Sequence, residues 1–562
     1  MRVTYRGASY RRISASTNNA VLFGDEENNL LTALGGDNIV YGGQGDNIVL
    51  AGIDFFGVNP DPNPNRETIS IGVRDDAGNN TVFTGNGNDI IITGTGHDTI
   101  YAGEGDNEIE DFGGSSVVFT GSGDDLINLN YYFAPDGSVV ISAHAENQVY
   151  AGDGNNGMTL FGDKNSVYTG SGDDRIFINR LVYGNGGIKV CYLGDNYVGT
   201  GEGNNFINVF GHKNRIETGN GADILNINIA DAGGNAIEKF EFAENTVYLG
   251  EGNNAMTVFG LVNEIYTGSG DDRIFVNRYI ADNGSIHVSD IGINRIFAGS
   301  GNNVINAFGH DNQISSGDGD DTINLNIVNS GDSLIIINEN ATNIVNAGHG
   351  NNAMTVFGTQ NTIHTGSGDD RIFVNRFLSD GGTLKINHEG QNFINAGDGH
   401  NFINVSGRHN RIYTGSGDDI IETSGSGGYY FINTGNGNNH ICLFGSHNTY
   451  DVHVGHGVNS FSLLDGAGIA TIYGFTSDDK IIFADPSQIT VTQENHDAVV
   501  RSSNSGILGI LKNTLATAVQ IFSPEHPSAS GLGVTANSIL EPLSPRDNSL
   551  IAAGLPSSLP PL

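Results

Sequence analysis

The chain has 562 residues, of which 82 are Gly, 12 are Pro and none is Trp, and its formal net charge is −38. A surface this acidic repels nucleic acid and anionic membranes and attracts cations, so nucleic acid is not an expected partner. The two cysteines, Cys191 and Cys442, lie far apart in sequence and do not make a disulfide framework. No apolar stretch is long enough to predict a transmembrane segment.

Residues 1–84 precede the regular part of the sequence. Residues 1–20 form a basic N-terminal arm, "MRVTYRGASYRRIS" and the residues after it, with four Arg and no apolar core, so it is not a classical secretory signal. This arm is interpreted either as a disordered tail without a binding role or as a segment that docks on an acidic neighbouring subunit. Residues 21–84 are expected to be irregular first turns, with a Pro-rich excursion at 59–65.

Residues 85–465 repeat with a fixed period. Gly-x-Gly begins at 121, 170, 219, 268, 317, 366 and 415, and a second series begins at 103, 152, 201, 250, 299, 348 and 397, so the interval within each series is constant. The phrase "VYTGSGDDRIFINR" at 167–180 returns with small changes at 265–278 and at 363–376. Each 49-residue unit consists of four nonapeptides and one insertion of the length of "NRLVYGNGGIKVC".

The nonapeptides predict very short strands wound into a coil. Their eighth position is aliphatic, as in Val167, Ile176, Val198, Ile207, Ile216, Leu225, Val247, Met256, Ile265 and Ile274. One inward apolar residue per nine, with Gly turns between, fits strands and not helices, because Gly and Asn are poor helix formers. Two nonapeptides make one turn, and successive turns bury their aliphatic residues against each other.

The loops resemble those of the RTX (repeats-in-toxin) calcium-binding β-roll family, whose repeat reads Gly-Gly-x-Gly-x-Asp-x-aliphatic-x. In "TGSGDDRIF" Thr169 replaces the first Gly and Asp174 takes the sixth place. The resemblance covers roughly residues 20–465. It implies an all-β fold: a parallel β-roll or β-helix solenoid of Gly-rich nonapeptides in 49-residue units with a 98-residue alternation, inserted β-hairpins and a C-terminal β cap.

The resemblance also implies Ca²⁺ between same-edge loops of successive turns. The expected ligands are backbone carbonyls and the sixth-position side chains, which are Asp89, Asp98, Asn107, Asp125, Asn156, Asp174, Asn205, Asp223, Asn254, Asp272, Asn303, Asp321, Asn352, Asp370, Asn401 and Asp419. Loops of the form "FGDKN" fall on the opposite edge and carry Asn instead. We therefore expect metal along one edge, weakened by having one carboxylate per site, and an Asn ladder along the other. Plain turn chemistry is the alternative for both residue types.

The insertions have Gly, Asn or Asp at their centres and alternating apolar residues beside them, as in "NRLVYGNGGIKVC". This pattern predicts β-hairpins, which could tile edge to edge into an extra sheet, and we expect them to pair within or between molecules; unpaired surface loops are the alternative.

After the repeats, residues 466–524 are similar to the capping region of RTX proteins. Residues 525–562, rich in Ser, Pro, Leu and Ala, are expected to be a disordered tail. In the family this region serves as a type I secretion signal, so the resemblance implies export; a bare flexible tail is the alternative.

The sequence contains no zinc-protease or nucleophile-elbow motif and is expected not to be an enzyme. The leading hypothesis is a secreted calcium-dependent structural protein, extracellular or at the cell surface, that assembles with itself into a layer, sheath or fibril. Its layout is similar to that of cyanobacterial surface-fibril glycoproteins. The alternative is a calcium-stabilised adhesin or carbohydrate-binding module with a cell-surface polysaccharide as partner, and a polysaccharide-modifying enzyme is favoured least.

Overall fold

The computed structural model describes residues 2–59, 68–74, 77–134, 137–183, 186–232, 236–330, 334–379 and 381–524. These residues form two compact units, one ending at Val262 and one beginning at Asn263. The regular structure of both is almost entirely β, and the described 3-10 helices are η2 (Pro486–Gln488) and η3 (Ala516–Ala518). In this described part of the chain, no helix has the length and apolar character needed to cross a membrane.

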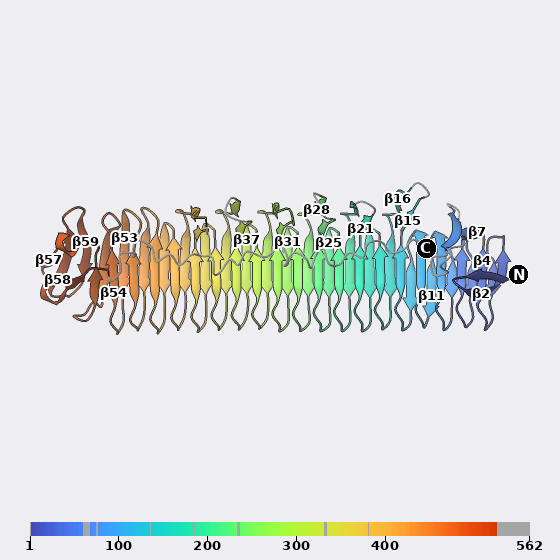
Figure 1. Cartoon of the computed structure of the whole chain (residues 1–562), viewed down its shortest axis with the longest axis horizontal. Coiled ribbons are helices and arrows are strands. Elements are labelled where there is room, and N and C mark those ends of the chain that lie inside the picture. The colour runs from blue at the N-terminus through green and yellow to red at the C-terminus, as the bar shows by residue number, and fades with distance from the viewer. Residues whose placement is uncertain are drawn as a thin grey trace. The chain divides into compact units, whose positions relative to one another are not determined.

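In the first unit the chain coils so that its strands alternate between two parallel sheets (Figure 1). The first sheet contains β2 (Ala8–Ala15), β4 (Asn29–Ala33), β6 (Ile48–Ala51), β10 (Ile90–Thr95), β12 (Glu108–Gly113), β14 (Leu126–Leu129), β18 (Gly157–Leu160), β20 (Arg175–Ile178), β24 (Phe206–Val209), β26 (Ile224–Ile227) and β30 (Ala255–Val258). The second sheet contains β3 (Val21–Phe23), β5 (Ile39–Tyr41), β9 (Thr81–Phe83), β11 (Thr99–Gly103), β13 (Val117–Thr120), β17 (Glu146–Tyr150), β19 (Lys164–Tyr168), β23 (Asp195–Gly199), β25 (Lys213–Glu217) and β29 (Glu244–Tyr248).

The second unit repeats this arrangement, with β31 (Val262–Tyr266) at its start. Its first sheet contains β32 (Arg273–Val276), β36 (Val304–Ala307), β38 (Thr322–Leu325), β42 (Ala353–Val356), β44 (Arg371–Val374), β48 (Phe402–Ser406), β50 (Ile420–Ser424), β52 (His440–Leu443), β54 (Ser460–Leu463), β56 (Lys480–Ile482) and β60 (Gln520–Phe522). Its second sheet contains β35 (Ile293–Phe297), β37 (Asp311–Ser315), β41 (Thr342–Asn346), β43 (Gln360–His364), β47 (Gln391–Asn395), β49 (His409–Tyr413), β51 (Tyr429–Asn433), β53 (Asn448–His453) and β55 (Gly468–Tyr473).

The strand register confirms the predicted nonapeptide frame and the all-β parallel coil. Ile90 of β10 lies opposite Glu108 of β12, so one turn of the coil spans two nonapeptides. Leu126 of β14 lies opposite Gly157 of β18, so a turn that carries an insertion keeps the same register. The predicted inward positions are all buried between the two sheets. Because the register is kept across an insertion, the inserted residues lie outside the coil.

Two edges join the sheets, and they are chemically different. The first edge holds the Gly-x-Gly loops that lead from a second-sheet strand into a first-sheet strand. The second edge holds the return loops and the insertions. An Asn in the left-handed conformation begins each regular insertion, namely Asn130, Asn179, Asn228, Asn277, Asn326 and Asn375, with φ between +55° and +68°. Asn tolerates this conformation, so it turns the chain out of the coil.

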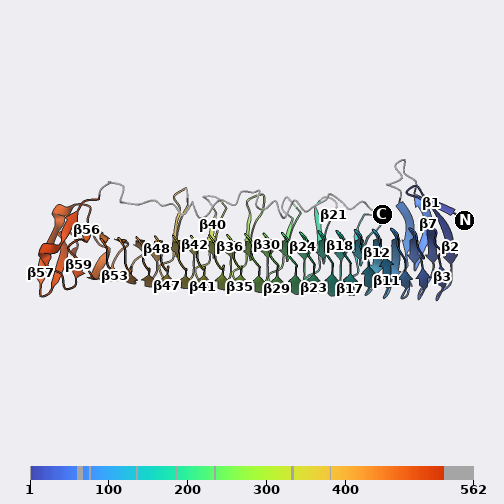
Figure 2. The same ribbon diagram turned by 90° about the horizontal axis from the view of Figure 1, so that it is seen from below.

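The insertions form hairpins that project from the second edge of each unit (Figure 2). The pairs are β7 (Ile53–Asn59) with β8 (Thr68–Val73), β15 (Tyr131–Phe133) with β16 (Val139–Ile141), β21 (Arg180–Tyr183) with β22 (Gly187–Val190), β27 (Ile229–Asp231) with β28 (Ile237–Lys239), β33 (Arg278–Ile280) with β34 (Ile286–Val288), β39 (Ile327–Asn329) with β40 (Ile335–Ile337) and β45 (Arg376–Leu378) with β46 (Leu384–Ile386). The predicted hairpins are confirmed, the extra sheet within one chain is absent from the described residues, and pairing between molecules stays a prediction. Each pair is its own two-stranded sheet, and among the described residues no backbone ladder joins one hairpin to the next.

The ends of the described chain depart from the repeat. The basic N-terminal residues do not form a separate arm: β1 (Arg2–Tyr5) pairs antiparallel with β2, and β2 joins β4. Tyr5 and Tyr10 are buried against Leu30, which anchors this segment. In the second unit the turn becomes longer from β50 onward, since Ile420 lies opposite His440.

Beyond the last regular turn, β57 (Ile489–Glu494), β58 (Asp497–Ser502) and β59 (Gly506–Leu511) run antiparallel. This stretch lies within 466–524, for which capping stays a proposal. The predicted tail, 525–562, lies outside the described residues.

Candidate metal site

The sixth-position residues of the first edge form a continuous buried ladder within each unit. The backbone N–H of Asn156 donates to Oδ1 of Asp174 at 2.9 Å, and the N–H of Asp174 donates to Oδ1 of Asn205 at 3.2 Å. The same pattern runs through the second unit, where Asn352 N–H donates to Asp370 Oδ1 at 2.8 Å. Each side chain thus fixes the distance to the next turn as well as its own loop.

The structure places the predicted ligands as two sets. Fifteen lie on the first edge and are at most 2% exposed, namely Asp89, Asn107, Asp125, Asn156, Asp174, Asn205, Asp223, Asn254, Asp272, Asn303, Asp321, Asn352, Asp370, Asn401 and Asp419. Asp98 does not belong with them. It precedes β11 on the second edge, because it follows a first-sheet strand and sits half a turn out of step with Asp89 and Asn107.

Asn and Asp act differently within this ladder. The Asn amide donates into its own loop, as Asn352 Nδ2 does to Gly350 O at 3.0 Å and Asn303 Nδ2 to Gly301 O at 3.0 Å. These bonds show that the loop carbonyls point toward the sixth position. An amide therefore satisfies carbonyl oxygens that a bound cation would otherwise satisfy, whereas Asp has no donor to offer.

The second edge carries the predicted Asn ladder, which the structure confirms. Asn147 Nδ2 donates to Asn165 Oδ1 at 2.8 Å and to Phe161 O at 2.9 Å. In the second unit Asn312 Nδ2 donates to Asn343 Oδ1 at 2.9 Å. Each amide is buried, so each bond replaces one that water would have made.

The loops of the first edge and their spacing match a known repeat. The sequence profile of the RTX calcium-binding nonapeptide repeat, which holds four copies, matches residues 15–54, 75–109, 193–225, 289–323, 357–376 and 395–426. The chain carries RTX calcium-binding nonapeptide repeats. RTX repeats bind Ca²⁺, are typically structural elements, and occur typically in secreted proteins. A comparison with curated proteins found no match.

The Asp residues of the RTX repeats have the chemistry that calcium requires. Oδ2 is buried without a hydrogen-bond partner in Asp89, Asp125, Asp321, Asp370 and Asp419. In Asp223 the Oδ2 instead accepts from the Thr218 hydroxyl at 2.6 Å. A buried carboxylate oxygen with no donor needs a proton or a cation. Since Ca²⁺ prefers oxygen ligands, these carboxylates and the loop carbonyls beside them fit the ion.

The electrostatics of the RTX ladder support the same need. Burial, the largest effect, raises the pKa of Asp89 and of Asp321 to about 7 and that of Asp370 to about 6. Neighbouring N–H and hydroxyl donors only partly oppose it. A cation beside these carboxylates would remove the cost of their charge. Which positions hold an ion stays a prediction.

Carboxylates alone do not complete such a site. In the described ranges, no three His, Cys, Asp or Glu side chains gather so that they could hold a metal ion. Any calcium ligand set on the first edge therefore depends on backbone carbonyls, which places the ion between loops and not on a side-chain cluster.

Two exposed ladders beside the RTX ladder were not predicted. At the fifth position, Asp173 Oδ1 accepts from Asn204 N–H at 2.7 Å. At the third position, Asp153 Oδ1 accepts from Ser171 N–H at 2.7 Å. The sequence did contain a pattern that indicates these ladders, because side chains with hydrogen-bond acceptors recur at both positions through the repeats. They hold the outer part of the first edge and add to its negative charge.

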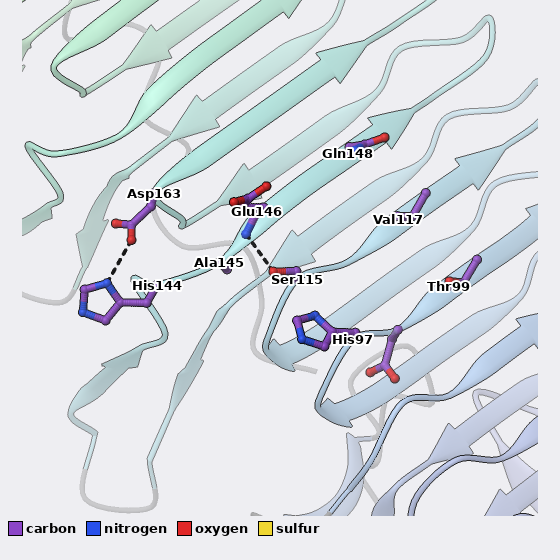
Figure 3. Close-up of a pocket in the computed structure, with 10 residues that line it drawn as sticks. His97, Thr99, Ser115, Val117, His144, Ala145, Glu146, Gln148 and Asp163 are labelled. Atoms are coloured by element: carbon purple, nitrogen blue, oxygen red, sulfur yellow. Dashed lines mark hydrogen bonds and ion pairs between the residues drawn. The ribbon is translucent and has the colours of Figure 1, made fainter.

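A surface hollow of about 540 Å³ lies on the second edge of the first unit (Figure 3). His144 Nδ1 lies 2.9 Å from Asp163 Oδ2, and Glu146 N–H donates to Ser115 Oγ at 2.9 Å. The His144 side chain is 87% exposed, so this pair is an open surface contact. The hollow presents acidic oxygen atoms at the second edge, beside Asp98.

Proposed function

We propose that this protein is a secreted, calcium-dependent structural protein whose copies associate through the hairpin side into a layer, sheath or fibril at the cell surface. The RTX repeats occupy both units and support the calcium-dependent, structural part of this proposal. No catalytic role is included in it. The tail at 525–562 remains the proposed type I secretion signal.

The observation that carries the assembly proposal is the row of separate hairpins. Each is a two-stranded sheet by itself, so its outer strands offer edges to another chain. Natural proteins usually protect such edges, and repeated open edges favour pairing between molecules. The constant interval between the hairpins would let many weak contacts act together.

Exposed apolar side chains follow three consecutive hairpins at the same spacing. Leu193 and Phe242 occupy equivalent places just after two hairpins of the first unit and are 72% and 60% exposed. Ile291, at the equivalent place in the second unit, is 40% exposed. Single exposed apolar residues are ordinary, but their recurrence at one repeat position favours a contact surface.

Net charge makes this association depend on calcium. Chains with a net charge of −38 repel one another in the absence of a bound cation. Calcium on the first edge would lower this repulsion while leaving the hairpins on the second edge uncovered. Assembly is therefore expected only at calcium concentrations that also fold the coil.

Electron microscopy of the purified chain in millimolar calcium tests the proposal. We expect ordered fibrils or sheets from the natural sequence and dispersed particles from a Leu193→Asp, Phe242→Asp double variant. Leu515→Asp is the matched control, because Leu515 is 67% exposed but lies outside the repeats; it should assemble normally. Dispersed molecules of the natural sequence, with folding verified by circular dichroism, would instead favour the adhesin or carbohydrate-binding alternative.

A further inference from the structure

Four buried oxygen-bearing side chains meet at the second edge of the first unit. Thr93 of β10 lies opposite Asp111 of β12 in the strand register. Asp98 and Ser116 precede β11 and β13, whose residues Thr99 and Val117 lie opposite each other. The four residues therefore form the corners of a square on two consecutive turns, with the two Asp on one diagonal. Each is at most 1% exposed.

Both acids depart from what the repeat places at these positions. The position of Asp111 is Leu129 in the next turn and Leu160 in the one after, as part of the aliphatic core. The position of Asp98 is Asn80 in the preceding turn and Ser116 and then Asn147 in the following ones, so Asp98 stands in place of an Asn of the ladder. Turn chemistry alone does not account for an Asp in the core column, because Asp111 lies within a strand.

The hydrogen bonds of the square leave acceptors and hydroxyls unmatched. Ser116 Oγ donates to Asp111 Oδ2 at 2.6 Å, and Gly113 N–H donates to Asp111 Oδ1 at 2.9 Å. Asn80 donates to Asp98 Oδ1 from its backbone N–H and from Nδ2, at 2.6 and 3.0 Å. The Thr93 hydroxyl lies close enough to both Asp to lower their pKa values, yet its Oγ1 and Asp98 Oδ2 are buried without a hydrogen bond of acceptable geometry.

The square is electrostatically incomplete. Burial, the largest effect, and repulsion by Asp111 raise the pKa of Asp98 to about 8. The largest effects on the two carboxyl groups are burial, the hydrogen bonds around them and, for Asp98, the charge of Asp111, and none of these comes from a basic side chain. Two adjacent buried carboxylates cannot both stay ionised without a positive charge between them. Either one proton is shared between them, or a cation occupies the square.

We propose that Thr93, Asp98, Asp111 and Ser116 form a calcium site at the second edge, separate from the nonapeptide loops of the first edge. It rests on the calcium-binding part of the proposed function and not on assembly. The ligand atoms are all oxygen, which suits Ca²⁺ and does not suit metals that prefer nitrogen or sulfur. Two carboxylates on adjacent turns give more negative charge than the alternating Asp and Asn of the first edge, so this site binds more tightly.

The surface hollow in Figure 3 supplies an approach for the ion. Asp98 lines it together with Glu146 and Asp163, both acidic. An acidic mouth raises the local concentration of a divalent cation at the point where the buried site comes nearest the surface. The exposed His144–Asp163 pair then belongs to the entrance and not to the ligand set.

The test uses the full chain with Asp98→Asn and Asp111→Leu introduced together. The introduced Asn and Leu are the residue types that later turns carry at the same two positions, so both substitutions are compatible with the packing of the coil. Radioactive calcium is measured by equilibrium dialysis after removal of metal by chelator, and hydrogen exchange of β10–β13 is followed at each calcium concentration. Asp125→Asn, which alters only the first edge, is the control.

We expect one calcium ion per chain to bind at least about tenfold more tightly than the rest in the natural sequence. This tight ion should be lost in the double variant and kept in Asp125→Asn. Protection of β10–β13 should rise together with its binding. Identical binding curves for the natural chain and the double variant would overturn the proposal and leave a shared proton as the explanation. Absence of calcium binding anywhere would instead contradict the calcium dependence of the whole protein.

Discussion

At the residue scale, an arginine recurs every 98 residues, buried in the first two copies and half-buried in the third. Arg180, Arg278 and Arg376 occupy equivalent places at the base of a hairpin. Asp231 acts on Arg180, and Glu422 acts on Arg376. Arg278 is 5% exposed, and its Nε and Nη1 are buried without a hydrogen-bond partner. Burial lowers its pKa to about 10, and no described acid opposes that effect.

Asn324 stands where the next 98-residue repeat has Glu422. We predict that Asn324→Glu increases the free energy of unfolding of the second unit by about 2 kcal/mol, because it gives a buried guanidinium the carboxylate it lacks. Urea unfolding in excess calcium measures the change. Asn226→Glu is the matched control, since Arg180 already has an acid; it should give no gain. Equal effects of the two substitutions would contradict this account.

His440 gives the second unit a pH dependence of known sign. Its Nδ1 lies 2.6 Å from Ser460 Oγ, and burial lowers its pKa below the usual 6.5. The unfolded chain then takes up a proton at a higher pH than the folded chain does. This contribution to stability is complete above pH 6.5 and is lost as the pH falls through the lower folded pKa.

We therefore predict that local stability around β52 falls between pH 7 and pH 5, and that His440→Gln removes this part of the pH dependence. Hydrogen exchange of β50–β54 at fixed calcium measures it. His456→Gln, which alters an exposed histidine nearby, should keep the natural profile. If His440→Gln retained the full acid loss, other groups would be responsible.

At the element scale, the first-edge loops need Gly where two backbones approach. Gly368 has φ +146°, and a Cβ there would lie 2.0 Å from Gly350 O of the preceding turn. Gly382 has φ +81° but no atom within 4 Å of its Cβ position. Comparing substitutions at the two glycines therefore distinguishes the cost of a steric collision from the cost of backbone strain alone.

Gly382→Ala should cost only the strain of a left-handed residue, about 1 kcal/mol. Gly368→Ala adds a collision with the neighbouring loop, so we predict a loss of about 3 kcal/mol or more. Hydrogen exchange should show the loss in β42–β48 and not throughout the chain, because each turn contacts only its neighbours. Similar costs for the two variants would mean that the loop spacing relaxes freely.

The same elements show what the sequence could predict. The constant repeat interval and the aliphatic eighth position specified the strands, the register and the second-edge Asn ladder, because these depend on a local period. That each hairpin stays a separate sheet was not predictable from the period, since a period does not show whether neighbouring hairpins form a common backbone ladder. Asp98 precedes β11 and Asp111 lies within β12, and the two become adjacent only when consecutive turns are stacked. No motif marks that pair.

At the scale of the whole molecule, repulsion among the charges that sum to −38 opposes folding. The buried Asp residues of the first edge add to this cost, because one oxygen of several of these carboxylates loses water without gaining a donor. A cation that binds only the folded loops would remove both costs together. Calcium binding and folding are therefore expected to be coupled.

We predict a largely disordered chain in chelator and a β-rich chain in millimolar calcium, followed by far-ultraviolet circular dichroism. Sodium chloride at the same ionic strength screens surface charge but supplies no divalent cation to the buried carboxylates of Asp321 and Asp370, so it should not replace calcium. Asp321→Asn with Asp370→Asn should fold at lower calcium, because an Asn amide supplies the donor that these loops lack, as Asn303 and Asn352 already do. An unchanged spectrum across the calcium titration would contradict the coupling of folding to calcium binding. Full folding in sodium chloride would mean that calcium acts only by screening charge.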